Sequence, residues 1–574
     1  MMFNKYHHFF YIFLLLFLGS NFAYKYNYNY TVVFYKKKSE ETIMKYDLMI
    51  KNVTIVDGTG EPAFNGAIAV SEGRIAKVYR NMQPSTEETE ESREVLDGER
   101  MILSPGFIDI HTHSDTTIID VPEAHSRILQ GITTDFGGNC GISAAPFNPA
   151  FESDHRYYLR ESFGDKPFSW ESMREYLSCV EAAKPSVNVG TLVGHGTIRI
   201  AAMGFSPEKP SDEQMNSMKK YLKDALEDGA FGMSSGLIYP PGSFAKADEL
   251  EELAKVLVPY DAVYSTHMRN EGLNLISSVK EAIHLAEESG VFAEISHHKE
   301  IRKELWKDAV FDSIALLKEA RERGVKIAFD QYPYSASATS LDSNVSGWAF
   351  EGGQEKLFEN LRNPKTREKL VKEANDSHVG RWGDIYISYA HGDENQWAVG
   401  KNIIEIADIL GKDPAEACFD LILATEGRVN EVNYGMCEED IEYIMSQDFG
   451  VIGSDGEAMD LGFGGIPHPR NFGTFPRVIS HYCRDRKLFS LEKAIQKMTG
   501  MPAKRMGLVD RGFIMEGMWA DLVLFDFDKI NDSPTYDNPK QPCEGIKRVY
   551  VNGMLTALDG KHTGARAGKV LRHV

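Results

Sequence analysis

Cysteine is scarce in this chain of 574 residues, and its spacing excludes two classes of protein. The six cysteines are scattered along the chain and form no CxxC pair; they are Cys140, Cys179, Cys418, Cys437, Cys483 and Cys543. Such spacing is not that of a disulfide framework or of a zinc ribbon. Five of them fit buried free thiols. Cys140 differs, because it follows a glycine-rich stretch.

Clustered positive charge and long apolar runs are also lacking. Acidic residues outnumber basic residues by 84 to 63, which gives a formal net charge of −21. No group of Lys and Arg is dense enough to follow a phosphate backbone, so we expect no nucleic-acid partner. The apolar run 9–18 is too short to span a bilayer comfortably, and we expect no membrane span in the mature protein.

The first 43 residues differ in character from the rest of the chain. An early Lys5, the apolar run 9–18 and small residues up to Ala23 are typical of a secretory signal peptide. Alternatively, translation starts at Met44, where well-patterned sequence begins, and residues 1–43 are a spurious upstream extension. The sequence leaves both interpretations open.

Two strand-rich ends enclose a different middle. Residues 44–104 and 507–574 carry short alternating runs of Ile, Val and Leu between Gly and Asp turns, as in "DLMIKNVTIVDG" and "GIKRVYVNGMLTALDG". We therefore predict one small β-sandwich domain assembled from both ends of the chain.

Residues 105–506 alternate apolar runs with amphipathic helical stretches. The runs that we interpret as strand ends are "NVGTLVGHG", "FGMSSG", "AVYSTHM", "FAEISHHK", "VKIAFDQYPY", "IYISYAHG" and "FGVIGSDG". This alternation predicts βα units with a parallel sheet, and their number favours a TIM-like (β/α)8 barrel over an open sheet. A polar stretch near residues 343–385 interrupts the pattern and predicts a helical insertion.

Candidate metal ligands follow these strands. In "PGFIDIHTHSD", His111 and His113 stand two residues apart, so at the end of a strand both imidazoles point the same way. Four further candidates come after later strands: Cys140, His267, His297 and Asp455. Each of them alone could be a structural residue. Because the strand ends of a βα barrel share one rim, the six together predict a site for one or two zinc ions.

Long motifs in the chain resemble those of a known family. These motifs are "SPGFIDIHTHSD", "GITTDFGGNCGISAAP", "GMSSGLIYPPGSFA", "YSTHMRNEG", "EISHHK", "FDQYPYSAS", "GSDG" and "HPRNFGTFPRV". They are similar to the signature stretches of the N-acyl-D-amino-acid deacylases, or D-aminoacylases, a branch of the amidohydrolase superfamily. The resemblance runs from about Met44 to Asn552.

The resemblance implies roles for the candidate ligands. Cys140, His267 and His297 would hold a tightly bound zinc, with His111, His113 and Asp455 at a weaker second site. Many relatives bridge two metals with a carboxylated lysine, but "GGNCGIS" contains no lysine. Asp455 would accept the proton of the attacking water and return it to the departing amine. Zinc would polarise the amide carbonyl, with His195 of "VGHGTIR" as an assisting group.

The resemblance also implies residues that contact the substrate. Arg470 would bind the free carboxylate of an N-acyl amino acid, because a guanidinium pairs with a carboxylate in bidentate fashion. Lys299, Tyr332 and Ser337 occupy other substrate-contact positions of the family. A surface ion pair is the alternative role for Arg470, and loop packing is the alternative for Tyr332 and Ser337. Arg269 and Glu271 are predicted to form an ion pair that orients His267, with direct catalysis as the alternative role.

The predicted function is zinc-dependent hydrolysis of N-acyl-D-amino acids. The alternatives are a cyclic-amide hydrolase of the hydantoinase, dihydropyrimidinase or dihydroorotase kind, and a non-catalytic scaffold of the same fold. Cys140 and "GMSSGLIYPPGSFA" argue against the first, and the complete ligand set argues against the second. The link between Asp455 and Arg470 is longer than is usual in the family, which leaves the preferred side chain open.

The acyl group, the number of metals and the oligomeric state stay open as well. We expect a cytoplasmic protein, because a zinc thiolate suits a reducing compartment. If residues 1–23 are a real signal peptide, the protein would instead be secreted or directed to the endoplasmic reticulum.

Overall fold

The computed structural model describes residues 44–160 and 168–573. The predicted leader, residues 1–43, lies outside these ranges, and its two interpretations remain predictions. Among the described helices, none combines the length and the apolar character that a membrane-spanning segment needs.

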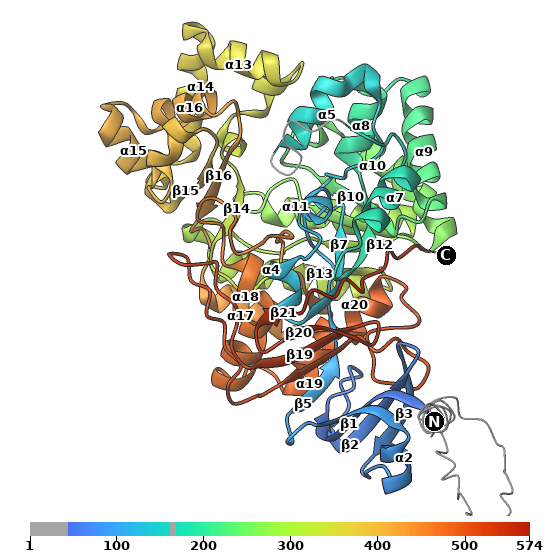
Figure 1. Cartoon of the computed structure of the whole chain (residues 1–574). Coiled ribbons are helices and arrows are strands. Elements are labelled where there is room, and N and C mark those ends of the chain that lie inside the picture. Colours follow the sequence, from blue (N-terminus) through green and yellow to red (C-terminus); the bar gives the residue numbers. More distant parts are fainter. Residues whose placement is uncertain (1–43, 161–167, 574) are drawn as a thin grey trace, which may run out of the picture. The chain divides into compact units, whose positions relative to one another are not determined.

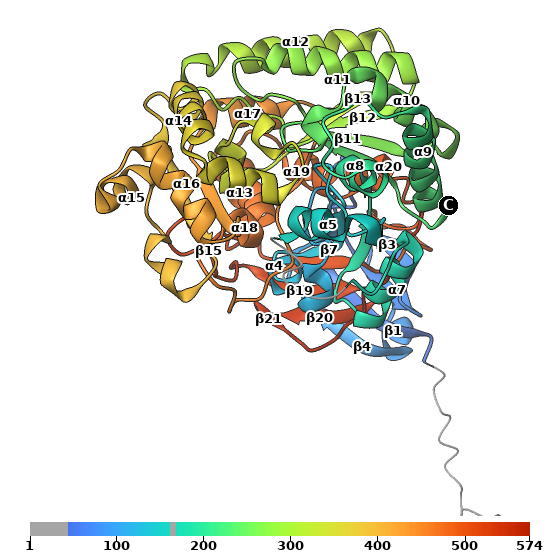
Figure 2. The same ribbon diagram turned by 90° about the horizontal axis from the view of Figure 1, so that it is seen from above.

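Eight parallel strand positions form the central barrel (Figures 1 and 2). In chain order they are β6 (Phe107–Asp109), β7 (Ile132–Gly137), β8 (Asn188–Thr191) with its continuation β9 (Val193–Gly194), β10 (Gly232–Gly236), β11 (Val263–His267), β12 (Phe292–Ile295), β13 (Ile327–Gln331) and β17 (Gly450–Ile452). Each pairs in parallel with the next. The last strand rejoins the first where Asp455 N donates to His111 O at 2.8 Å and His113 N donates to Gly456 O at 2.7 Å. The predicted barrel is thereby confirmed.

Amphipathic helices cover the outside of the barrel. They include α9 (Asp212–Glu227), α10 (Ala247–Leu257), α11 (Leu275–Ser289) and α12 (Asp308–Glu322), which flank the strands in Figure 2. Helix α9 begins at a capping box in which the Ser211 hydroxyl accepts from the Gln214 N–H and the Gln214 side chain accepts from the Ser211 N–H. Its buried Met218 and Leu222, four residues apart, lie on one face and join the barrel core.

Both ends of the chain contribute to one nine-stranded sheet, in which blue and red strands lie together in Figure 1. Its strands are β1 (Tyr46–Ile55), β2 (Phe64–Ser71), β3 (Arg74–Arg80), β4 (Ser92–Asp97), β5 (Ile102–Pro105), β18 (Leu522–Phe525), β19 (Ile546–Val551), β20 (Met554–Leu558) and β21 (Lys561–His562). The two chain ends meet where β5 runs antiparallel to β18.

Strand β18 joins this sheet to the barrel. Leu522 and Leu524 pack into the core of the nine-stranded sheet, whereas Val523 and Phe525 pack into the barrel core. Alternate residues of a strand face opposite sides, so one strand contributes to both cores. The chain from Met44 onward forms one compact unit. The domain limits 44–104, 105–506 and 507–574 therefore stay an interpretation of the sequence.

An insertion separates β13 from β17 and is drawn in yellow and orange in Figure 1. It contains a three-stranded antiparallel sheet in the order β14 (Ser337–Ser340), β16 (Val429–Asn433), β15 (Ile385–Ala390). Its helices are α13 (Gln354–Arg362), α14 (Pro364–Ser377), α15 (Ile403–Leu410) and α16 (Pro414–Ala424). Helices α13 and α14 lie within the predicted insertion near residues 343–385. The observed insertion extends beyond this range, through β16.

One predicted barrel strand was assigned wrongly. The run "IYISYAHG" forms β15, which belongs to the sheet of the insertion and not to the barrel. Its Tyr386 and Tyr389 are only half buried, whereas all five residues of β11 are buried. A barrel strand is covered on both faces, whereas an edge strand of a small sheet is covered on one face. The short apolar run does not distinguish these two cases.

Candidate metal centre

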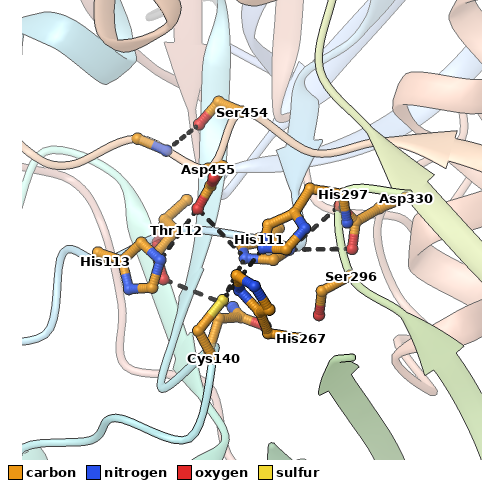
Figure 3. Close-up of polar contacts among 12 residues, drawn as sticks. His111, Thr112, His113, Cys140, His267, Ser296, His297, Asp330, Ser454 and Asp455 are labelled. Atoms are coloured by element: carbon orange, nitrogen blue, oxygen red, sulfur yellow. Dashed lines mark hydrogen bonds and ion pairs between the residues drawn. The ribbon is translucent and has the colours of Figure 1, made fainter. Parts of the chain in front are cut away.

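The six predicted ligands come together at the carboxyl ends of five barrel strands (Figure 3). His111 and His113 follow β6, and Cys140 follows β7. His267 ends β11, His297 follows β12, and Asp455 follows β17. Residues separated by more than 300 positions in the sequence thus reach one site, because parallel strands of a barrel end on the same rim.

Three of these residues have a backbone conformation that L-amino acids rarely adopt. The φ angle is 52° at Cys140, 36° at His297 and 55° at Asp455. Such conformations cost about 1–3 kcal/mol each and persist only where the surroundings impose them. At His297 the backbone N–H donates to the Asp330 carboxylate at 2.8 Å. The strained turns direct the three side chains toward one another.

Four ligand atoms form the first cluster, with every atom within 4.8 Å of the others. The Cys140 Sγ lies 3.3 Å from His111 Nε2 and 3.4 Å from His297 Nε2. Asp455 Oδ1 lies 3.4 Å from His111 Nε2 and 3.0 Å from His113 Nε2. The four members, His111, Cys140, His297 and Asp455, and the adjacent His113 offer nitrogen, sulfur or oxygen of the kinds that zinc prefers.

A second cluster shares His297 with the first and adds His267 and Glu271. The rings of His267 and His297 are 4.4 Å apart between centroids, and His267 Nε2 lies 3.4 Å from Glu271 Oε2. Apart from this longer contact with Glu271, the ring nitrogens of the buried His267 have no hydrogen-bond partner. A buried polar group without a partner is costly, so this imidazole is suited to a ligand that the side chains themselves do not provide. The residues present therefore fit a metal ion.

The charges at the site also favour metal binding. Burial raises the pKa of the Cys140 thiol, but the neighbouring His111 and His297 lower it by more. The resulting pKa is well below its usual value. Burial likewise raises the pKa of Asp455, while Arg470 and His297 bring it well below its usual range. A thiolate and a carboxylate are the forms in which these groups bind metals.

Two carboxylates orient the ligand imidazoles from behind. Asp330 Oδ1 and Oδ2 lie 3.1 Å and 3.0 Å from His111 Nδ1. Glu271 Oε1 lies 3.0 Å from His297 Nδ1 and accepts a hydrogen bond from Lys299 Nζ at 2.7 Å. Sequence analysis missed Asp330, although it stands near the end of β13, a position like those of the ligands.

The predicted ion pair between Arg269 and Glu271 is wrong. Arg269 pairs with Glu281 of helix α11 at 2.9 Å and donates to the carbonyls of Ser243 and Ala245. Glu271 faces the opposite way, toward the histidines. The spacing of two residues between Arg269 and Glu271 suggested a contact that the direction of the side chains prevents.

The predicted substrate-contact residues lie beside the first cluster. Arg470 is buried, and its Nη1 is 2.6 Å from Asp455 Oδ2, so the alternative of a surface ion pair is wrong. The guanidinium of Arg470 lies 5.2 Å from the centre of the Tyr332 ring. Lys299 is buried against Glu271, and Ser337, which begins β14, is partly exposed.

His195, the predicted assisting residue, is buried beside Glu249. Its Nε2 lies 2.8 Å from Glu249 Oε1, an oxygen that also accepts a hydrogen bond from Arg199 at 3.1 Å. Neither cluster of ligand atoms includes His195. Tyr239, which sequence analysis did not single out, stands closer to the ligands, with its ring 5.1 Å from that of His267. The motif "GLIYPPG" was the available signal.

Comparison with known proteins agrees with the fold and the site. The sequence profile of the Amidohydrolase family matches residues 94–378 and 440–557. An N-acyl-D-glutamate deacylase of Alcaligenes xylosoxydans xylosoxydans is 32% identical over 528 residues, which cover 92% of this chain and 97% of that protein. Residues 379–439 of this chain, which the profile does not match, contain β15 and β16 of the insertion.

Solved structures give the same result. A crystal structure of N-acyl-D-glutamate deacylase from Bordetella bronchiseptica, complexed with zinc and a phosphonate that mimics the tetrahedral intermediate, has a TM-score of 0.76 at 31% identity, covering 92% of this chain and 100% of that one. A D-aminoacylase studied for its binuclear metal centre has the same TM-score and coverage at 32% identity. A D-hydantoinase at 12% identity and a TM-score of 0.53 shares the fold alone.

Proposed function

Because this chain belongs to the amidohydrolase family, in the branch of the D-aminoacylases, we propose that it hydrolyses N-acyl-D-amino acids to a carboxylate and a free D-amino acid. The observation that carries this proposal is the pairing of a thiolate-containing ligand cluster with a buried arginine beside it. The cluster suits amide hydrolysis, and the arginine suits the free carboxylate of the substrate.

We assign zinc as the metal, held tightly by Cys140, His267 and His297, with a weaker second position at His111, His113 and Asp455. When bound, zinc supplies a Lewis acid that polarises the amide carbonyl and lowers the pKa of a bound water to about 7. His297 shares the first cluster of ligand atoms with Cys140 and the second with His267, which supports metal binding by these three residues.

Asp455 is the proposed general base and acid. Burial raises the pKa of its carboxyl group, but Arg470 and the neighbouring histidines lower it by more, to well below its usual range. The carboxylate is therefore ionised. It can accept a proton from the attacking water and pass it to the amine that leaves. Its Oδ1 faces His111 and His113, and its Oδ2 faces Arg470. The two oxygens thus connect the metal ligands to the proposed substrate anchor.

Arg470, Lys299 and Tyr332 form the proposed carboxylate site. Arg470 Nη1 pairs with Asp455 and Nη2 donates to the Ala338 carbonyl at 3.2 Å. Its Nε has no hydrogen-bond partner, and the buried hydroxyl of Tyr332 lacks one as well. Donors left without acceptors in a buried site are suited to an anion from outside. Ser337 completes the group at the partly exposed edge of β14.

The proposed compartment is the cytosol. All six cysteines are free thiols, and Cys140 is a proposed metal ligand. A reducing compartment keeps such thiols available. N-terminal sequencing of the protein from its native source distinguishes a start at Met1, a start at Met44 and cleavage after about residue 23.

The test of the proposed function uses protein that begins at Met44 and is loaded with zinc. Amine release is followed from N-acetyl-D- and N-acetyl-L-methionine and from the two glutamate analogues, with a hydantoin and dihydroorotate beside them. We expect release from D substrates only, and the better D substrate names the side-chain preference. Asp455→Asn is the control that should lose this release. Ring opening without amide cleavage would instead assign the cyclic-amide reaction.

A further inference from the structure

Arg127 is a fully buried arginine outside the ligand set. It lies on the short helix α4 (His125–Ile128), and its side chain is 0% exposed. Its Nη1 donates to Asp109 Oδ2 at 3.1 Å and to Ser454 Oγ at 2.8 Å. Its Nη2 donates to the Asn471 carbonyl at 2.6 Å. We refer to Arg127, Asp109, Ser454 and Asn471 as the seam cluster.

Each acceptor in the seam cluster stands next to a proposed active-site residue. Asp109 precedes His111 by two residues, Ser454 directly precedes Asp455, and Asn471 directly follows Arg470. One planar guanidinium is therefore bonded to the three chain segments that carry the first histidines, the proposed base and the proposed substrate anchor.

The backbone around the seam cluster is tied to the same groups. Asp109 Oδ1 accepts from the His111 N–H at 3.3 Å and from the Ser454 N–H at 2.9 Å. Ser454 Oγ accepts from the Gly456 N–H at 3.0 Å, a contact visible in Figure 3. The carboxylate of Asp109 thus fixes the residues on both sides of the gap between β6 and β17.

This gap is a short join of the barrel. Strands β6 and β17 belong to separate sheets, and an isolated bridge between Thr112 and Gly456 connects their ends. Elsewhere in the barrel, neighbouring strands such as β10 and β11 pair over five successive residues. Two backbone hydrogen bonds also cross the gap, from Asp455 N to His111 O and from His113 N to Gly456 O. The side chains of the seam cluster add to this short backbone join in setting the relative position of the ligands from β6 and β17.

We propose that Arg127 is a positioning residue that holds Asp455 in register with His111 and His113 across the barrel seam. This inference rests on the proposed function only for its effect on turnover. A buried ion pair is weak evidence for stability by itself, because desolvation offsets the attraction between the charges. The fork of Arg127 instead provides directed bonds to three acceptors, which a lysine ammonium cannot reproduce in the same geometry.

The experiment compares Arg127→Met and Arg127→Lys with the zinc-loaded wild-type protein. Binding of a second metal is measured by titrating the one-zinc protein with Co²⁺ and following the absorbance of the bound ion. Residues that support metal ligands change metal affinity or activity by about 10- to 100-fold when they are replaced. We expect Arg127→Met to weaken the second metal and to lower kcat by amounts in this range. The zinc at Cys140, His267 and His297 should be retained.

The lysine variant should recover little of either loss, because it restores charge but not the directed bonds. Arg511→Met is the matched control, since Arg511 is also buried and pairs with Asp521, which directly precedes β18 of the nine-stranded sheet. Both methionine variants should lower the melting temperature, but Arg511→Met should leave second-metal affinity and kcat unchanged. If Arg127→Met does not fold, Ser454→Ala removes one acceptor and should give a smaller loss in the same direction.

The role of Arg127 is overturned if Arg127→Met, or Ser454→Ala where the first does not fold, keeps second-metal affinity and kcat within twofold of wild type. Failure of the proposed function is a separate result. If the wild-type protein releases no amine from any N-acyl-D-amino acid, the metal titration alone decides the role of Arg127. If only one metal binds, kcat decides it.

Discussion

Arg470 and Asp455 form a buried ion pair, with Nη1 and Oδ2 separated by 2.6 Å. The proposed substrate anchor and the proposed general base are therefore in direct contact before substrate binds. A substrate carboxylate that binds at the unpartnered Nε of Arg470 would lie beside Asp455. Substrate recognition and proton transfer are thus linked through one pair of side chains.

Replacing Asp455 by Asn should lower kcat by about 10²–10⁴-fold, which is the usual contribution of a general base. The amide of Asn cannot accept a proton, but it keeps the size of the side chain. The tightly bound zinc and KM should change little, since Cys140, His267 and His297 remain. Steady-state kinetics and metal analysis of the same sample test this. A near-normal rate with zinc bound would assign the base role to another group.

Replacing Cys140 by Ala should remove the tightly bound zinc. The thiol of Cys140 has a pKa well below its usual value, because the nearby His111 and His297 outweigh burial, so it is available as a thiolate ligand. Metal analysis after dialysis should give much less zinc than in wild type, with activity lost in proportion. Cys418→Ala is the control, because Cys418 lies buried in the core of the insertion, away from the ligands. Equal zinc content in both variants would contradict the assignment.

Arg470→Lys should raise KM for N-acyl-D-amino acids by about 10- to 100-fold. A hydrogen bond to a charged group is worth about 1.5–3 kcal/mol, and each 1.4 kcal/mol corresponds to a factor of ten. The lysine keeps one positive charge beside Asp455 but cannot bind a carboxylate through two parallel bonds. Initial rates over a wide range of substrate concentration give the value. An unchanged KM would show that the substrate carboxylate binds elsewhere.

Asp330→Asn should weaken metal binding by His111. Asp330 holds His111 Nδ1 and the backbone N–H of His297, and loss of its charge frees the ring to reorient. Second-metal affinity or kcat should fall by about 10- to 100-fold. The titration with Co²⁺ described for Arg127 measures this effect. If the variant binds the second metal as wild type does and keeps its kcat, Asp330 has no orienting role.

Glu431 should make the stability of the protein depend on pH. Burial in the insertion raises the pKa of Glu431 to about 8, although Asn344 donates to its carboxylate at 2.6 Å. The folded protein then keeps a proton that the unfolded chain gives up above its ordinary pKa of 4.5. The stabilisation is complete below that pKa, decreases from there by at most about 1.4 kcal/mol per pH unit, and is lost as the pH rises through 8.

Glu431→Gln removes this titration and can still accept from Asn344. Between pH 5 and pH 9, the melting temperature of wild type should fall relative to that of the variant. Glu359→Gln, on an exposed position of helix α13, is the matched control and should follow wild type. Parallel curves for wild type and Glu431→Gln would show that Glu431 is ionised in the folded protein.

Local sequence was enough to predict the barrel and the ligands. Alternating apolar runs and amphipathic helices depend on neighbours close in the chain, so strands such as β11 and helices such as α9 could be recognised from their own residues. The motif of His111 and His113 predicts two imidazoles on one side because of the geometry of a strand. Cys140, His267, His297 and Asp455 were candidates because they follow later strands, and the resemblance to the D-aminoacylases gave them roles; the structure brings all of these together.

What the tertiary structure alone decided is which side chains meet across the chain. Arg269 turns to Glu281 rather than Glu271, His195 turns to Glu249, and Asp330 supports His111. The run "IYISYAHG" joins a sheet outside the barrel, and Arg127 connects segments more than 300 residues apart. Spacing along the chain determines which face a residue occupies. The direction of a long side chain and the identity of its partner depend on packing between distant segments, which no local pattern contains.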